Sequence, residues 1–345
     1  MPEPPSTIRS LARSLRWPLI ALALLLLFNA IVSPEMFSIG VRDGRLYGVL
    51  VDILNHGARV AIVALGMALV IAVGGVDLSV GAVAAIAGAV TATLVAQMHV
   101  PWPFAAAAAL AAGALCGAWN AWLVITLRLQ PIVATLILMV AGRGIAQLIT
   151  DGQIVTCDNP GIAAIGNGTF LGLPVPVTIL IVMAVLTALA VRRTPLGLFI
   201  ESIGDSPAAS RLAGVPDRAV RLVVYGTCGL LAALAGVIEC SYIKAADANN
   251  AGNLLELDAI LAVVIGGTSL RGGRVALAGT ILGALFMQTV TKTLYMLNVS
   301  AEVAPAPKAA AVVLVCLLQS PAFRSWCAAK LKLNGSVKAN GGGTP

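Results

Sequence analysis

The feature that most restricts the fold of this chain is the length of its uncharged stretches. Between Arg59 and Arg128 the only charged residue is Asp77. That interval has room for three helices of about 20 residues, the length needed to cross the hydrocarbon layer of a membrane. With 59% hydrophobic and 11% charged residues, the sequence also has too little polar surface to cover a water-soluble globule. We therefore expect an all-α integral membrane protein.

Apolar runs of this kind recur along the chain, and we expect about ten membrane-spanning helices. The fifth run carries Arg143 between two glycines and is expected to be broken or to line a cavity. Residues 256–272 are counted as a full crossing, because an even number of spans brings both termini to the same side. The runs lie near residues 17–32, 53–73, 78–97, 103–127, 131–149, 175–191, 219–242, 258–270, 275–297 and 305–320.

The formal net charge of +7 indicates membrane topology and not a nucleic-acid partner, because lysine and arginine are scattered at the ends of apolar runs. Basic residues precede the first run and follow the last. The positive-inside rule then predicts cytoplasmic tails at 1–16 and 322–345, on either side of a transmembrane domain at 17–321. The loop 150–174 contains no lysine or arginine, so it is expected on the outer, periplasmic side.

Residues 192–221 are the long polar interruption between these apolar runs. A hydroxyl residue followed by proline occurs twice, which is typical of a capped helix start, and a glycine follows each pair where a short helix would end. The sequence therefore predicts two short helices in tandem, after which Asp217 can cap the next long helix. The residues concerned are Thr194, Pro195 and Gly204, then Ser206, Pro207 and Gly214.

This loop also carries more apolar side chains than a merely solvated loop needs. They would provide the contacts that fit a groove in a partner protein. The alternative is an amphipathic loop that rests on the lipid surface. The side chains are those of Leu196, Phe199, Ile203, Leu212 and Val215.

A second polar feature is the motif GGVDLSVG at 74–81. A carboxylate at membrane depth costs about 2.5–3.5 kcal/mol unless it meets partners or water, so Asp77 should not face lipid. The glycines before it interrupt the helix, and Ser79 can cap the next one. Two interpretations remain open. Asp77 is itself the N-cap of the third span, or it lines or braces the route of a polar solute.

A third feature is the glycine-rich segment that follows Glu256. Its paired glycines, with Arg271 and Arg274 beside them, would form a hinge at the junction of two spans. Close helix packing is the alternative, because glycine often serves that purpose in membranes. The glycines are Gly266, Gly267, Gly272 and Gly273.

Hydrolytic and metal-binding motifs are absent from the sequence. No lysine lies in a GxxxxGK[ST] motif, so the chain cannot hold ATP phosphates in a P-loop. There is no HExxH and no GxSxG motif, and the chain has only two histidines. The six cysteines show no metal or disulfide spacing. We expect no catalytic residue, metal or cofactor in this chain.

These motifs together resemble the permease subunits of ABC importers, in the ribose and simple-sugar branch. The likeness rests on the GGxDLSxG signature at 74–81, the ELDAIxAVVIGG segment from Glu256 and the loop 192–221, and it covers roughly residues 50–290. Segments at 43–46, 51–55, 132–144 and 246–252 look most like galactofuranose permeases. The segment after Gly283 departs from the family pattern and leaves the entry to the tenth span open.

The resemblance implies a type II-like permease fold in a bacterial inner membrane, with both termini in the cytoplasm. It implies three partners: an ATPase subunit that binds ATP and Mg²⁺, a second permease of the same or a homologous chain, and a periplasmic sugar-binding protein. The implied substrate is galactofuranose or a similar simple sugar.

In that family the loop 192–221 docks into the ATPase. The implied coupling residues are Glu201, Gly204, Ala208, Ala209, Arg211 and Gly214. The implied translocation pathway or gate contains Asp77, Ser79, Asn249, Asn250, Glu256, Asp258, Gly266, Gly267, Gly272 and Gly273.

Two other classes of protein are weighed against this interpretation. An ion-coupled secondary transporter of a small polar solute would need buried carboxylates in pairs, and Asp77 alone is thin support for it. A membrane enzyme would need a nucleophile and a base, which the sequence does not supply.

Overall fold

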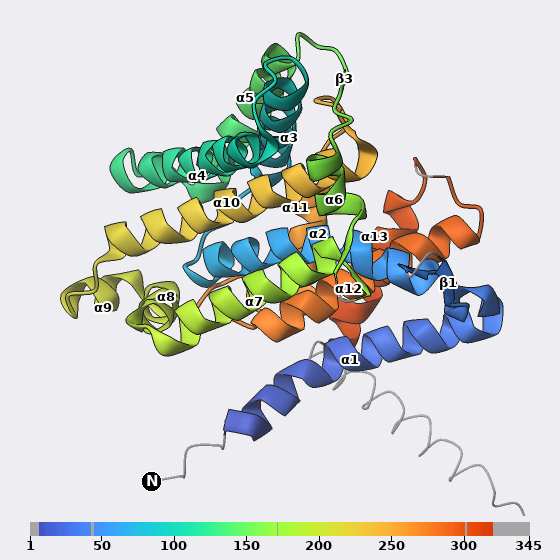
Figure 1. Ribbon diagram of the computed structural model, residues 1–345. Helices are drawn as coiled ribbons and strands as arrows, with labels where there is room; N and C mark the ends of the chain where they lie inside the picture. The colour runs from blue at the N-terminus through green and yellow to red at the C-terminus, as the bar shows by residue number, and fades with distance from the viewer. Residues whose placement is uncertain (1–6, 43–44, 171, 301, 320–345) are drawn as a thin grey trace, which may run out of the picture.

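The computed structural model describes residues 7–42, 45–170, 172–300 and 302–319. The predicted C-terminal tail at 322–345 lies outside these residues. The described chain is mostly helical (Figure 1), as expected for an all-α membrane protein. Its helices are α1 (Thr7–Val32), α2 (Val49–Ala72), α3 (Val80–Ala96), α4 (Trp102–Thr126), α5 (Pro131–Ile149), α6 (Pro160–Asn167), α7 (Val175–Arg193), α8 (Pro195–Asp205), α9 (Pro207–Leu212), α10 (Asp217–Ile243), α11 (Leu255–Ile265), α12 (Leu277–Met296) and α13 (Pro305–Gln319).

The remaining elements are short and lie in the connections. Three two-stranded antiparallel pairs and one 3₁₀ turn, η1 (Pro34–Phe37), are present among the described residues. The pairing of β3 with β6 joins the loop after α5 to the loop after α10, because Val155 lies opposite Ala246. The strands are β1 (Gly40–Arg42) with β2 (Arg45–Tyr47), β3 (Val155–Thr156) with β6 (Ala245–Ala246), and β4 (Thr169–Phe170) with β5 (Leu173–Pro174).

Six described helices are long and apolar enough to cross a membrane: most of α1, then α2, α4, α5, α7 and α10. Each of the ten apolar runs expected from the sequence falls on a helix. Of the two alternatives expected for the fifth run, a broken helix is not found, since α5 runs without a break from Pro131 to Ile149.

The expected full crossing at 256–272 is also corrected. Helix α11 has 11 residues, which span about 16 Å at 1.5 Å per residue, whereas the hydrocarbon layer is about 30 Å thick. The helix ends where the glycine pairs begin. Gly267, Gly272 and Gly273 have φ values of 88°, 90° and 84°, in the left-handed region that disrupts a right-handed helix.

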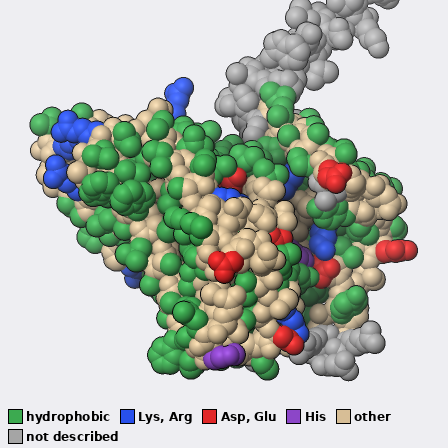
Figure 2. All heavy atoms as spheres, turned by 90° about the horizontal axis from the view of Figure 1, so that it is seen from above, with side chains coloured by type: hydrophobic (Ala, Val, Ile, Leu, Met, Phe, Trp, Pro, Cys, Tyr) green, Lys and Arg blue, Asp and Glu red, His purple; other side chains and the backbone are tan. Residues whose placement is uncertain are grey.

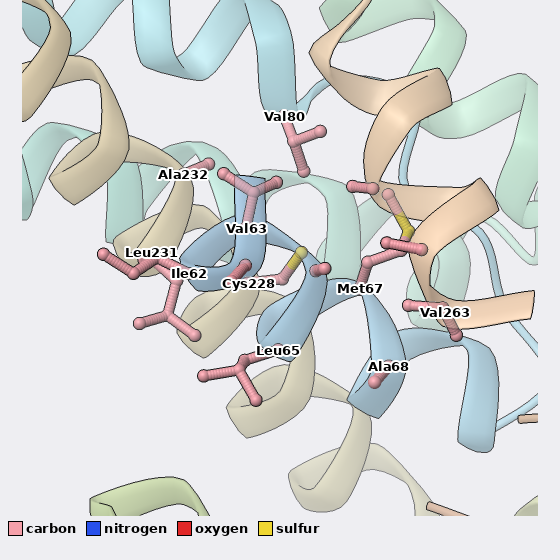
Figure 3. Packing of buried hydrophobic residues seen from close by; sticks show 14 of the residues in the cluster. Ile62, Val63, Leu65, Met67, Ala68, Val80, Cys228, Leu231, Ala232 and Val263 are labelled. Carbon is pink, nitrogen blue, oxygen red and sulfur yellow. The ribbon is translucent and has the colours of Figure 1, made fainter. Parts of the chain in front are cut away.

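Helix α2 lies at the centre of the molecule. Residues 60–73 are all buried, and they pack against α10 on one side and α11 on another. Figure 3 shows Ile62, Leu65 and Met67 of α2 beside Cys228 of α10 and Val263 of α11. A helix that is hydrophobic all round is typical of the core of a helix bundle.

Helices α4 and α10 lie side by side and approach closely (Figure 1). A Cβ added at Gly117 of α4 would lie 2.1 Å from the carbonyl oxygen of Tyr225 in α10. Only a residue without a side chain allows this approach, as in other small-residue contacts between membrane helices.

The short helices α8 and α9 lie at one end of the molecule, with the last turn of α7 and the first turn of α10 (left in Figure 1). The end of α2 lies there too, because Gly204 of α8 sits against Ala72. Basic side chains gather at this end in Figure 2, whereas acidic and basic side chains are mixed toward the other.

Candidate functional site

The loop 247–254, just before α11, has a defined shape that Asp247 organises. Its carboxylate accepts hydrogen bonds from the backbone N–H groups of Asn249 (3.0 Å) and Asn250 (3.2 Å). The side-chain amide of Asn250 donates to the second carboxylate oxygen at 2.7 Å. These bonds, above all the one from the Asn250 side chain, hold the pKa of Asp247 below its usual range because they stabilise the charged form.

Helix α5 fixes this loop from the side. The Arg143 guanidinium donates to the carbonyl oxygens of Ala248, at 3.4 Å, and Ala251. Gln147, one turn further along α5, donates to the Asn249 side chain at 2.6 Å. Arg143 also lines a cavity, so the second of the two alternatives expected for this run is confirmed.

The cavity beside Arg143, here called the polar cleft, has a volume of about 500 Å³. It lies between the start of α3, the middle of α5 and the start of α11. Its wall combines two charged side chains, Arg143 and Glu256, with two side-chain amides and with apolar residues of α3 and α5. The lining residues are Ala82, Met139, Val140, Arg143, Gly144, Gln147, Asn253 and Glu256.

The polar cleft opens on an outer face of the chain. Val140 and Leu148, on the same helix as Arg143, are 70% and 78% exposed. Charged side chains inside a spanning segment rarely face lipid and usually line a hydrated cavity or meet another chain. The cleft is thus a place where a polar solute or a second protein chain would be expected.

A second cavity of about 490 Å³, here called the charged cavity, lies on the other side of α11. Five helices contribute to it. Its charged groups are paired: Lys308 with Asp258 at 2.7 Å, Lys292 with Asp52 at 3.2 Å, and Arg59 with Glu239 at 3.6 Å, while Arg59 also contacts His56 at 2.9 Å. The predicted pathway residues Asn250 and Asp258 face this cavity, whereas Glu256 faces the polar cleft.

Of these paired charges, only Asp258 was predicted from the sequence to belong to a site. One signal was available, because Asp52, His56 and Arg59 are spaced by four and three residues and so share one face of a helix. Their partners come from α10 and α12, and no local pattern connects them.

Asp77 and Ser79 form a third polar group, the closed centre, together with Asn120 of α4. The Asp77 carboxylate accepts from the backbone N–H of Ser79 at 2.9 Å and from its hydroxyl at 2.6 Å. Asn120 donates to the Ser79 hydroxyl at 2.8 Å and to Asp77 at 3.4 Å. Asp77 is 1% exposed and, like Ser79, lines neither cavity.

The closed centre also shows which residue occupies the N-cap of α3, for which the sequence offered Asp77 and Ser79. Ser79, not Asp77, occupies the N-cap position of α3, and its side chain makes no cap hydrogen bond. The prediction that Asp77 is the N-cap is therefore wrong, whereas Ser79 occupies the predicted position but does not make the expected side-chain hydrogen bond. The physical reason is that the Ser79 hydroxyl is already engaged by Asp77 and Asn120, which connect the turn after α2 to α4.

The four predicted gate glycines differ from one another. A Cβ at Gly266 would lie 2.5 Å from the backbone of Gly279, so Gly266 serves the packing of α11 on α12. Gly267, Gly272 and Gly273 have positive φ values. The N–H of Gly273 donates to the carbonyl oxygen of Ala72 at 3.0 Å, which ties this segment to the end of α2.

The helix signals in the loop 192–221 are largely confirmed. The Thr194 hydroxyl accepts from the N–H of Leu196 at 3.2 Å, and the Ser206 hydroxyl accepts from Ala209 at 3.3 Å. Gly214 has a φ of 78° just after α9. The expected cap by Asp217 is wrong, because its carboxylate binds Arg221 (2.7 Å) and Arg211 (3.2 Å) instead.

Gly204 was predicted to end the first short helix of this loop, and the structure gives it a different role. It lies inside α8 and does not end it, since the helix continues to Asp205. A Cβ there would lie 1.9 Å from the Ala72 carbonyl oxygen and 2.4 Å from the Gly273 nitrogen. The glycine is needed for close approach, so α8, the end of α2 and the segment after α11 meet at one point.

The other predicted coupling residues lie on the surface. Among the expected apolar contacts, Ile203 is buried against the core, whereas Leu212 is 92% exposed. Leu198, which the sequence analysis did not single out, is 70% exposed. The exposed coupling residues are Glu201, Ala208, Ala209, Arg211 and Gly214.

No grouping of three His, Cys, Asp or Glu side chains that could hold a metal ion occurs in the described part of the chain. The site therefore consists of hydrogen-bonding and charged side chains in two cavities, with an exposed helical pair at one end.

Comparison with known proteins decides what kind of membrane protein carries this site. The family model described as "Branched-chain amino acid transport system / permease component" matches residues 49–318. The chain belongs to this permease family. No solved structure matches it.

The relatives of this permease are sugar importers. It is 49% identical to the galactofuranose transporter permease protein of Escherichia coli strain K12, over 91% of this chain and 93% of that one. The fructose import permease protein of Bifidobacterium longum is 37% identical, over 95% and 94% of the two chains. The ribose import permease protein of Escherichia coli strain K12 is 38% identical, over 88% and 92%. The chain is thus a multi-pass inner-membrane permease of the sugar ABC importer type and is not itself an enzyme.

Proposed function

We propose that this permease carries galactofuranose, or a similar monosaccharide, along the polar cleft, which a second permease chain closes on its open side. The observation that carries the proposal is the position of Arg143, Gln147 and Glu256. They line a cleft that opens on an outer face of a membrane-embedded chain, where contact with lipid would leave the charges of Arg143 and Glu256 unsolvated. A facing copy would convert the open cleft into an enclosed hydrated route.

The chemistry of the cleft suits a sugar. Arg143 and the amides of Gln147 and Asn253 offer donors, and Glu256 offers acceptors. A sugar hydroxyl both donates and accepts, so such a mixed wall can exchange hydrogen bonds with it as it passes. The identity of the sugar is inferred from the galactofuranose permease relative, which shares 49% of its residues with this chain.

ATP and Mg²⁺ are assigned to a separate ATPase subunit that docks on α8 and α9, and a periplasmic binding protein is assigned to deliver the sugar. The exposed residues Glu201, Arg211 and Leu212 support α8 and α9 as the docking surface. On this basis the end that holds these helices is cytoplasmic.

A mechanical connection from the ATPase to the cleft is also proposed. Gly204 of α8 touches Ala72 at the end of α2 and Gly273 in the segment after α11. Movement of α8 would therefore displace the base of α11, whose other end carries Glu256. The glycines with positive φ in that segment would absorb the change in backbone angles.

Uptake into vesicles tests the proposed function. The permease is reconstituted with its ATPase and binding protein, and ATP-dependent uptake of labelled galactofuranose, ribose and fructose is compared. Galactofuranose is expected to enter fastest, with vanadate blocking uptake. Uptake driven by a proton or sodium gradient without ATP would favour the ion-coupled alternative and overturn the proposal.

Glu201→Lys tests the docking surface separately. Because the Glu201 side chain is exposed on α8, reversal of its charge should leave folding intact but prevent co-purification of the ATPase. Glu35→Lys is the matched control, since Glu35 is also exposed but lies outside the loop 192–221. Normal ATPase recovery with Glu201→Lys would show that α8 is not the docking surface.

A further inference from the structure

A third cavity lies at the end of the molecule that holds α8 and α9, away from both cavities described above. It has a volume of about 770 Å³ and lies between the last turn of α4, the turn after α9 and the first turn of α10. We call it the arginine pocket. Its lining residues are Val124, Ile125, Arg128, Arg211, Val215, Pro216, Asp217, Arg218, Ala219 and Arg221.

The charge of this pocket is strongly positive and only partly neutralised. Four of its lining residues are arginines, and Asp217 is the one carboxylate among them. Asp217 already binds Arg221 at 2.7 Å and Arg211 at 3.2 Å. Within the described chain, Arg128 and Arg218 have no acidic partner, so three of the four positive charges remain uncompensated.

The start of α10 adds to this field. Helix α10 is 27 residues long and begins at Asp217, so the positive end of its dipole and its first unpaired N–H groups lie at the pocket. Guanidinium groups bind phosphate oxygens through paired hydrogen bonds. Together these groups favour an anion that offers several oxygen acceptors, and a phosphate is one such group.

The surroundings of the pocket are apolar on the side of the membrane. Val124 and Ile125 form part of the wall. Leu127 of the loop after α4 and Leu222 and Val223 of α10 are exposed next to it in the sequence. Further along α4 the exposed indoles of Trp119 and Trp122 stack at 5.2 Å, and tryptophan is typical of the membrane interface.

We propose that the arginine pocket binds the phosphate of an anionic phospholipid, whose acyl chains lie along the exposed apolar faces of α4 and α10. Basic pockets between membrane helices bind such headgroups through charge and hydrogen bonding. Arg128 and Arg218 are the principal ligands, because Arg211 and Arg221 are already held by Asp217. The bound lipid joins the end of α4 to the start of α10, beside the surface proposed for the ATPase.

Lipid binding to the purified full-length chain tests the proposal. Mass spectrometry of the intact protein in detergent measures the apparent affinity for phosphatidylglycerol, with phosphatidylcholine as the uncharged comparison. Arg128→Gln with Arg218→Gln should weaken phosphatidylglycerol binding roughly 30-fold, as expected for the loss of two cationic contacts. Binding of phosphatidylcholine should not change.

The matched control is Arg192→Gln with Arg193→Gln. These exposed arginines lie at the end of α7, but they do not line the pocket, so their removal lowers the charge of the same end of the molecule without touching the site. Phosphatidylglycerol binding should then fall less than about threefold. An equal loss of phosphatidylglycerol affinity in the two double variants would mean that the lipid responds only to the total positive charge of this end, and it would overturn the proposal.

Two further measurements distinguish a lipid phosphate from free inorganic phosphate, and a bound lipid from the ATPase as the occupant of the pocket. Millimolar inorganic phosphate should not displace phosphatidylglycerol. Displacement would show that the pocket takes free phosphate and would overturn the lipid assignment. Addition of the ATPase should leave the lipid bound, and its release would show that the ATPase covers the pocket.

Folding of the variants is checked by the thermal midpoint in detergent. If the double Gln variant does not fold, the wild-type chain still decides the question, because phosphatidylglycerol should raise its midpoint more than phosphatidylcholine. Equal effects of the two lipids would contradict the proposal.

Discussion

The closed centre and the polar cleft are both polar regions inside a membrane protein, but they are built in opposite ways. In the closed centre, Asp77 and Ser79 bond to each other and to Asn120, and all three side chains are almost fully buried. In the polar cleft, Arg143 and Glu256 line a volume of about 500 Å³ that opens on an outer face.

This difference indicates separate roles. Hydrogen bonds between buried side chains, with no cavity beside them, hold helices together and lie out of reach of a solute. Side chains that border an open volume keep part of their bonding capacity for a passing molecule. The resemblance placed both Asp77 and Glu256 on the translocation pathway, and only their surroundings in the folded chain distinguish a bracing residue from one that lines a cavity.

The largest expected effect is on the closed centre. Asp77→Leu removes the acceptor for the Ser79 hydroxyl and N–H and weakens the hold on Asn120. Each buried polar group left without a partner costs about 1–3 kcal/mol, so the yield of folded protein should fall severely. Gel-filtration recovery of the membrane protein and its thermal midpoint measure this loss.

Asp77→Asn is the control for that variant, because its side-chain oxygen can still accept from Ser79. Its folded yield should return toward the wild-type value. Wild-type yield for Asp77→Leu, with uptake lost, would instead place Asp77 on the solute route and remove the contrast between the two regions.

The next effect is on transport through the polar cleft. Glu256→Gln keeps the shape of the side chain but removes its charge, and loss of a charged hydrogen bond is worth about 1.5–3 kcal/mol. Sugar uptake should therefore fall by roughly tenfold to 100-fold, with folded yield unchanged. Initial rates of uptake per folded molecule give the measurement.

Asp258→Asn shows which cavity carries the sugar. Asp258 lies on the same helix but faces the charged cavity, where Lys308 binds it at 2.7 Å. Its effect on uptake should be smaller than that of Glu256→Gln. The reverse order would assign the route to the charged cavity.

A smaller effect separates packing from hinge motion in the glycine segment. Gly267→Ala places an alanine at a φ of 88°, which resists a left-handed backbone by about 1–2 kcal/mol, and it should slow ATP-driven uptake severalfold. Gly266→Ala should mainly lower the thermal midpoint, because its Cβ would meet the backbone of Gly279 at 2.5 Å. Loss of stability in both variants with uptake unaffected would make the whole segment a packing element.

Sequence alone predicted the parts of the fold that depend on neighbouring residues. The apolar runs predicted the helices because lipid demands long uncharged stretches, and Thr194 and Ser206 marked helix starts because capping acts within a few residues. The sequence could not predict the partners of Asp77 or Arg59, since Asn120 and Glu239 lie on other helices. Gly204 was singled out for the wrong reason, because its contact with Ala72 exists only in the folded chain.

The smallest expected effect concerns Asp247, which shapes the loop beside the polar cleft. Its folded pKa is lowered, first by the Asn250 side chain, so its contribution to stability is fully present above the unfolded value of about 3.9 and is lost as pH falls through the folded value. Asp247→Asn should therefore lower the thermal midpoint at pH 7 by on the order of 1 °C, since the site is exposed and screened. The two chains should converge once the pH lies below the folded pKa of Asp247, where both side chains are neutral. A difference that persists there would mean that Asp247 acts through its shape and not through its charge, and the loop would then resemble the closed centre more than the open cleft.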